Sequence, residues 1–145
     1  MTKTKVDLGI VQETLLIPLW ARAAELQQPD PIICNSKSAE ILEAIDYDFD
    51  KFATAKNSQI GNCLRGLILG NWVRTYLKEY PQGLIVEIGA GLNTRFERVD
   101  NGKVRWFDLD LPAKYLQRFF LISRLLFLYI PPLRNSYRLA LVKLG

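Results

Sequence analysis

Two short clusters in the second half of the chain have residue types and spacing that could bind a nucleoside. The first, Glu87-Ile88-Gly89-Ala90-Gly91, places two glycines where the chain must turn sharply and let a ligand approach the backbone. The second, Asp108-Leu109-Asp110, ends the next β-branched run, and Asp110 comes 21 residues after Gly89. An acid at this position can accept both hydroxyls of a ribose. Strand, glycine turn and acid in this order predict a ribose-bearing ligand.

The residues around the turn favour a ligand without phosphates over a dinucleotide. The dinucleotide fingerprint has a third small residue three positions after its second glycine, where the pyrophosphate meets a helix N-terminus. Here that position holds Thr94, with Asn93 and Arg95 on either side. Glu87 would repel a pyrophosphate, and it is costly to bury in an apolar strand without a partner. We therefore expect its carboxylate to accept hydrogen bonds from nearby amides or to orient the loop.

The first 80 residues predict a mostly helical region. Residues 14–28 are rich in apolar side chains, and Pro18 is expected in a first turn or at a kink because its ring removes one backbone donor. A second helix is expected over residues 39–45. Its N-cap has three candidates, namely Asn35, Ser36 and Ser38.

The acidic, aromatic residues 46–50 indicate a loop or a helix end, and the clearest helix follows over residues 58–79. We expect this helix to pack on a core through an apolar stripe at helical spacing. The stripe consists of Ile60, Leu64, Leu67, Ile68 and Trp72. Gly66 and Gly70 weaken the helix slightly and would permit close packing against a neighbour.

After the turn at residues 81–83 the hydrophobic period changes from helix to strand. Residues 84–88 predict a buried parallel strand, and residues 104–107 predict a second strand after a short helix from about Thr94. The predicted fold class is α/β, in which a helical region (1–80) precedes the first part of a Rossmann-like parallel sheet (81–112).

The composition excludes several classes of site. The chain has no histidine, which excludes Cys/His zinc sites and Ser-His or Cys-His catalysis by this chain alone. The two cysteines, Cys34 and Cys63, are interpreted as small buried side chains rather than as a disulfide, and we expect no metal site. The N-terminus has no signal-peptide pattern, so a cytoplasmic protein is expected.

Residues 113–145 differ from the rest of the chain. They carry six basic and no acidic residues, a net +6, whereas residues 1–112 have a net charge of −2 and give no indication of nucleic-acid binding. The sequence allows us to identify two strands, both before residue 113. We interpret the change in composition as a shifted reading frame or a premature end, with an ordinary packed helix as the first alternative. A membrane-surface helix over residues 119–133 is the least favoured alternative.

Several segments resemble one known family. Glu87-Ile88-Gly89-Ala90-Gly91 is similar to the E/D-x-G-x-G motif of class I S-adenosylmethionine methyltransferases. The wider context resembles the leucine carboxyl methyltransferase family and its bacterial relatives related to polyketide O-methyltransferases. The resemblance covers about residues 11–112, through the segments ETLLIPLWARA, DPIICNSKSAEIL, VEIGAGLNTRFERVD and WFDLDLP. This chain has Asn35 and Asn93 where many members of the family have aspartate.

The resemblance implies a Rossmann-like, C-terminally truncated class I enzyme whose cofactor is S-adenosyl-L-methionine. It implies that Gly89 and Gly91 face the methionine part of the cofactor, with Ala90 and Glu87 in the same turn. Asp110 would hold the ribose, with Asp108 as the alternative. Arg65 resembles the arginine that pairs with the cofactor carboxylate, a strong bidentate interaction.

Three tryptophans, Trp20, Trp72 and Trp106, are expected in the core, and Arg95 and Arg98 could line the turn. The implied activity is O-methyl transfer to a carboxylate or hydroxyl of a small-molecule acceptor. No catalytic residue is assigned, and no nucleic-acid partner is expected. A non-catalytic remnant or cofactor-binding fragment of such an enzyme is the alternative, and a dinucleotide-binding protein is the third hypothesis.

Overall fold

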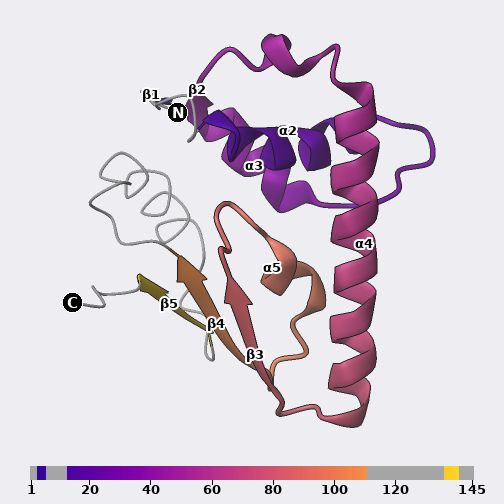
Figure 1. The fold of residues 1–145 in the computed structure, drawn as a ribbon, viewed down its shortest axis with the longest axis vertical. Coiled ribbons are helices and arrows are strands. Elements are labelled where there is room, and N and C mark those ends of the chain that lie inside the picture. Colours follow the sequence, from indigo (N-terminus) through magenta and orange to yellow (C-terminus); the bar gives the residue numbers. More distant parts are fainter. Residues whose placement is uncertain (1–2, 6–12, 111–135, 141–145) are drawn as a thin grey trace.

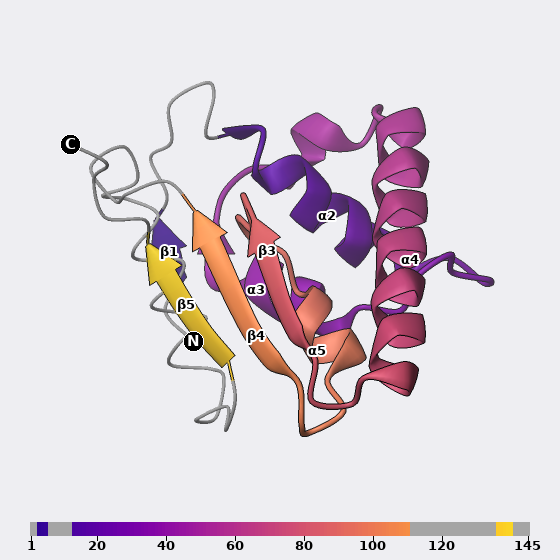
Figure 2. The ribbon, with the colours of Figure 1, turned by 60° about the horizontal axis from the view of Figure 1, so that its bottom comes forward.

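Three parallel strands form the sheet that carries the glycine turn. A computed structural model describes residues 3–5, 13–110 and 136–140. Strand β3 (Leu84–Ile88) pairs with β4 (Arg105–Asp110), and β4 pairs with β5 (Ser136–Ala140), in the order β3-β4-β5. The register places Glu87 opposite Asp108 and Ile88 opposite Leu109. The parallel pairing of the two predicted strands is confirmed (Figure 2).

The third strand corrects the prediction of two strands. Residues 136–140, in the part of the chain interpreted from its unusual composition, run parallel to β4 in register from Trp106 opposite Ser136 to Asp110 opposite Ala140. Pairing with a distant strand depends on tertiary context, which the composition of a five-residue segment does not reveal. The alternative of a packed helix in residues 113–145 is wrong for residues 136–140, and the remaining residues of this segment lie outside those described. The membrane-surface helix over residues 119–133 also lies outside the described residues.

The N-terminal helices pack above the sheet in the view of Figure 1. Helix α2 (Leu16–Glu25) contains Pro18 in its first turn, as expected, where a missing backbone N–H costs little. Helix α3 (Ser36–Ala44) begins after Asn35, whose side chain accepts a hydrogen bond from the Ser38 amide at 3.1 Å. Asn35 is thus the N-cap among the three candidates.

Short elements follow α3 before the long helix. The two-residue strands β1 (Thr4–Lys5) and β2 (Ile45–Asp46) pair in parallel, and a 3-10 helix, η1 (Phe49–Phe52), begins after Asp48. The loop or helix end predicted at residues 46–50 therefore contains the end of β2 and the start of η1.

Helix α4 (Lys56–Glu79) confirms the predicted long helix but packs through a different face. Its buried residues are Cys63, Gly66, Gly70 and Leu77. The predicted apolar stripe instead faces outward: Ile60, Leu64, Ile68 and Trp72 are exposed, and only Leu67 is half-buried. At Gly66 and Gly70 on the buried side, the neighbours approach closely and leave little room for a side chain. A Cβ at Gly66 would lie 3.1 Å from Ile33 Cδ1, and one at Gly70 would lie 3.3 Å from Arg98 Nη1.

Two apolar clusters hold the helices and the sheet together around the glycine turn. One, centred on α2 and α3, contains Leu92 of the loop after β3. The other joins α4 and the short helix α5 (Arg95–Val99) to the sheet and includes Trp106, which is 1% exposed and meets the Phe96 ring edge-on. Trp106 is a core residue, as expected, and Trp20 packs beside a third small cluster. Trp72, at 67% exposure, is not in the core.

Strand β3 has one covered face and one open face. Ile85 and Glu87 are half-buried toward α4 and α5, whereas Leu84, Val86 and Ile88 are exposed, Ile88 by 80%. The prediction of a fully buried strand is therefore wrong for this face, because the helices α4 and α5 cover only the opposite side.

The outer edge of β3 has no neighbouring strand among the described residues. Gly83 O accepts a hydrogen bond from the Arg105 amide, and the Gly89 amide donates to Leu109 O, so these residues face β4. Because the direction of backbone hydrogen bonding alternates along a strand, the N–H and C=O groups of Leu84, Val86 and Ile88 face the other edge.

Both cysteines are free thiols, but only one is buried as expected. Cys63 is fully buried, and this burial raises the pKa of its thiol to about 11. Cys34, which directly precedes the buried N-cap Asn35, is exposed. No helix in the described part of the chain has the length and apolar character needed to cross a membrane.

Candidate functional site

A cavity of about 520 Å³ lies between α2, α4 and the turn that follows β3. It brings together five of the predicted site residues, Arg65, Glu87, Gly89, Ala90 and Gly91. Its remaining lining residues come from the same elements: Leu15, Pro18, Arg22, Asn62, Gly66, Leu69, Val86, Ile88, Leu92, Asn93 and Arg95.

The glycine turn has the backbone geometry that its sequence predicts. Gly89 has φ +67° and Gly91 has φ +52°, values that side-chain-bearing residues rarely adopt. The amides of Gly89 and Ala90 both donate to Leu109 O of β4, at 2.7 and 3.3 Å, which fixes the turn to the sheet. A Cβ at Gly89 would have no atom within 4 Å, so the backbone here faces open space.

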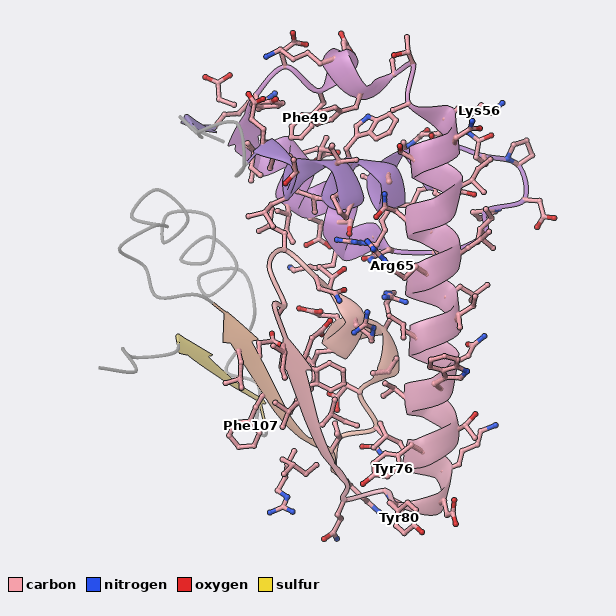
Figure 3. The ribbon with its side chains drawn as sticks, viewed as in Figure 1. Phe49, Lys56, Arg65, Tyr76, Tyr80 and Phe107 are labelled. Carbon is pink, nitrogen blue, oxygen red and sulfur yellow. The ribbon has the colours of Figure 1, made fainter. Side chains whose placement is uncertain are left out.

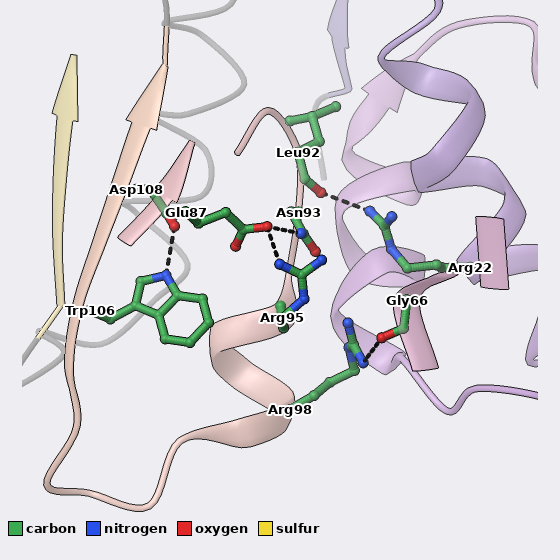
Figure 4. Close-up of polar contacts among 9 residues, drawn as sticks. All are labelled: Arg22, Gly66, Glu87, Leu92, Asn93, Arg95, Arg98, Trp106 and Asp108. Carbon is green, nitrogen blue, oxygen red and sulfur yellow. Dashed lines mark hydrogen bonds and ion pairs between the residues drawn. The ribbon is translucent and has the colours of Figure 1, made fainter. Parts of the chain in front are cut away.

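Glu87 points from β3 toward the loop and is held by two side chains. Its Oε1 accepts hydrogen bonds from Asn93 Nδ2 and from Arg95 Nη1, the latter also an ion pair (Figure 4). The expectation that Glu87 accepts hydrogen bonds from a nearby amide is thus confirmed, with a side-chain amide as the donor. Burial raises the pKa of Glu87 above its ordinary value of 4.5, and the Arg95 guanidinium opposes this rise.

The raised pKa makes the stability of the fold depend on pH in a defined direction. Above pH 4.5 the folded chain holds a proton on Glu87 more readily than the unfolded chain does, so unfolding releases it. The contribution of Glu87 to the free energy of unfolding is therefore fully present below pH 4.5. It is lost as the pH rises through the pKa of Glu87 in the folded chain. We expect the free energy of unfolding of the wild type, minus that of Glu87→Gln, to fall over this range.

Urea unfolding at a series of pH values measures this difference. Glu79→Gln, which removes an exposed carboxylate at the end of α4, is the control. A difference between wild type and Glu87→Gln that stays level or grows with pH would contradict the assignment.

Two arginines face the cavity from opposite helices. Arg65 lies midway along α4 and is exposed, and its Nη2 donates to Asn62 Oδ1 at 2.6 Å (Figure 3). Arg22 of α2 is buried, with Nη2 donating to Leu92 O at 2.9 Å (Figure 4). Burial, followed by the nearby Arg98 charge, lowers the pKa of Arg22 to about 10.

Arg22 was not among the predicted site residues. In the sequence, the only sign is a basic residue inside an apolar helix, at a position that turns out to be buried. A buried cation needs hydrogen-bond acceptors, which here are Ser38 Oγ, 16 positions away, and Leu92 O, 70 positions away. Because these acceptors are distant in the sequence, the local pattern does not reveal the role of Arg22.

The two predicted acids on β4 lie differently. Asp108 is buried and accepts a hydrogen bond from Trp106 Nε1 at 2.6 Å, and it is not part of the cavity lining. Asp110 ends β4, and its side chain lies outside the described part of the structure. Arg95 lines the cavity, whereas Arg98 lies against α4 and donates to Gly66 O at 3.5 Å. Among the described residues, no cluster of acidic or cysteine side chains is arranged to hold a metal ion.

Comparison with known proteins gives two relatives. The chain is 35% identical over 108 residues to the tetracenomycin polyketide synthesis O-methyltransferase TcmP of Streptomyces glaucescens, a match covering 74% of this chain and 40% of that protein. It is 29% identical over 120 residues to the S-adenosyl-L-methionine-dependent methyltransferase dpfgK of Gibberella zeae, covering 76% of this chain and 40% of that protein. No family model matches the chain.

The mixture of helices and a small parallel sheet agrees with these matches. The helical region followed by the start of a Rossmann-like parallel sheet is confirmed as the fold class. The chain spans about 40% of the length of the curated relatives it matches. Over the residues it shares with them, the chain is related in sequence to an O-methyltransferase and to an S-adenosyl-L-methionine-dependent methyltransferase.

Proposed function

We propose that the chain binds S-adenosylmethionine in the cavity beside the glycine turn, as part of an enzyme that transfers a methyl group to oxygen. The observation that carries this proposal is the cavity itself, which gathers Arg65, Glu87 and the two positive-φ glycines from separate elements. Similarity to two named methyltransferases supports the choice of cofactor over a dinucleotide.

The residues of the cavity fit the chemical groups of this cofactor. Arg65 and the buried Arg22 offer guanidinium groups for its carboxylate, and Glu87 offers a carboxylate for its amino group. The open space at Gly89 admits the methionine part close to the backbone. In this proposal Asp110 holds the ribose. Asp108 instead accepts a hydrogen bond from Trp106 of the same strand, which is a structural role.

The bound cofactor would supply a methyl group already activated by its sulfonium, so the protein's contribution is alignment and exclusion of water. The proposed acceptor is a carboxylate or hydroxyl of a small molecule, and no described residue is assigned a catalytic role. A cytoplasmic location and the absence of a nucleic-acid partner belong to the same proposal. The boundaries at residues 80 and 112 remain predictions.

Calorimetric titration with S-adenosylhomocysteine tests the binding proposal. We expect saturable binding by the wild-type chain, and a loss of at least about tenfold in affinity for Arg65→Ala, equivalent to about 1.4 kcal/mol. Lys78→Ala is the control because Lys78 is exposed on the same helix and does not line the cavity. A folded wild-type chain that does not bind would refute the proposal, and equal losses in both variants would refute the role of Arg65.

Transfer of a labelled methyl group to small carboxylic acids and phenols tests the activity separately. Transfer would support the enzyme, whereas binding without transfer to any acceptor would favour the cofactor-binding fragment.

A further inference from the structure

A buried chain of polar side chains connects the N-terminal helices to the glycine loop. Asn35 Nδ2 donates to Thr94 Oγ1 at 2.5 Å, and Thr94 Oγ1 lies 3.2 Å from Ser38 Oγ. Ser38 Oγ also accepts from Arg22 Nε at 3.1 Å, and Arg22 Nη2 donates to Leu92 O. We call these four side chains, Arg22, Asn35, Ser38 and Thr94, the polar clasp.

The polar clasp is removed from solvent. Ser38 and Thr94 are fully buried, and Asn35 and Arg22 are nearly so. Groups buried to this degree need partners, and here each finds one across a large separation in sequence, 56 to 70 residues between the helical region and the loop. The helices and the loop are therefore joined by directional bonds, in addition to the apolar contact of Leu92 with α2 and α3.

Three members of the clasp do not line the cavity. Asn35, Ser38 and Thr94 are absent from its wall, whereas Leu92 and Asn93, which immediately precede Thr94, are part of it. Asn93 also donates to Glu87, so the backbone position of Thr94 helps to place both the loop and the carboxylate. Any effect of Asn35 and Thr94 on a ligand must pass through the loop, whereas Ser38 can also act through Arg22, which lines the cavity.

We propose that Asn35, Ser38 and Thr94 are positioning residues, through which α2 and α3 hold the glycine loop in its ligand-binding geometry. This rests on the proposed function, since it assigns to the helical region control over cofactor affinity. Removal of a clasp hydroxyl loosens residues 89–93 and weakens binding while the cavity wall keeps its composition. A residue that merely filled space would tolerate an isosteric apolar replacement.

Thr94→Val and Thr94→Ser test this directly. Valine keeps the shape and removes the hydroxyl, whereas serine keeps the hydroxyl and removes a methyl group. We expect Thr94→Val to weaken S-adenosylhomocysteine binding at least tenfold, and Thr94→Ser to remain within threefold of the wild type. Thr75→Val, on the exposed side of α4, is the matched control and should bind like the wild type. Equal affinity for Thr94→Val and the wild type, or equal weakening by valine and serine, would overturn the proposal.

Amide hydrogen exchange separates this proposal from the proposed function. Without any ligand, exchange at residues 89–92 should be at least tenfold faster in Thr94→Val, while residues 73–77 of α4 exchange as in the wild type. If the wild type fails to bind but this local difference appears, the positioning role stands and the cofactor assignment fails. If exchange at residues 89–92 is the same in Thr94→Val and the wild type, the positioning role is overturned. Ser38→Ala, which keeps the hydrogen bond from the amide of residue 38 to Asn35 Oδ1, gives the same exchange test should Thr94→Val not fold.

Discussion

Replacing Trp106 by alanine is expected to lower the free energy of unfolding by about 3–5 kcal/mol. The indole is 1% exposed, packs edge-on against Phe96, and donates from Nε1 to the buried Asp108. Its removal would leave a cavity beneath α5 and take away a hydrogen bond to a buried carboxylate. Folded domains of this size are stable by about 5–15 kcal/mol, so the variant would lose a large share of its stability.

Trp72→Ala provides the comparison with the same change of side chain. Trp72 is 67% exposed on α4, and its replacement should change the free energy of unfolding by less than about 0.5 kcal/mol. Urea unfolding followed by far-ultraviolet circular dichroism measures both variants. A loss for Trp72→Ala as large as that for Trp106→Ala would show that the outer face of α4 is covered.

Introducing valine at Gly89 is expected to abolish measurable binding of S-adenosylhomocysteine, with a loss of at least about 100-fold, or about 2.7 kcal/mol. Gly89 has φ +67° and its missing Cβ would point into open space beside the cavity. A β-branched side chain is strained in this conformation and would occupy the space in which we place the methionine part of the cofactor.

Gly102→Val separates the effect of backbone strain from the effect of a side chain that blocks the cavity. Gly102 has φ +73°, and a Cβ there also has no atom within 4 Å, but Gly102 does not line the cavity. Both variants should therefore lose similar stability, on the order of 1–3 kcal/mol, while only Gly89→Val loses binding. Comparable affinities for the two variants would contradict the placement of the ligand at the turn.

Local sequence patterns predicted where the helices and strands of this fold lie better than which of their faces are buried. The spacing of large apolar residues located α4 to within two residues of its start, yet the face they form is the exposed one. The buried face uses Gly66 and Gly70, and glycine contributes nothing to a hydrophobic pattern. Close packing of Ile33 and Arg98 against these positions is a tertiary effect, visible only when the partners are known.

The candidate site likewise combines features that local sequence predicts with features that depend on distant contacts. The glycine turn, its positive φ angles and the need of Glu87 for hydrogen-bond donors follow from local chemistry, and all are found in the structure. Arg22 and the polar clasp depend on contacts between residues more than 50 positions apart. Asn35, where many members of the resembling family have aspartate, has a structural role as the N-cap of α3 and as a donor to Thr94.

The outer edge of β3, which no strand in the described part of the chain covers, bears on how this protein behaves at high concentration. Three outward-facing backbone positions and the exposed Leu84, Val86 and Ile88 form a template to which a further extended segment can add. Because Val86 and Ile88 also line the cavity, an added segment would compete with a ligand for the same wall. Under the proposed function, self-association at this edge and cofactor affinity would be thermodynamically linked. A measured dissociation constant would then be intrinsic only where dilution leaves it unchanged.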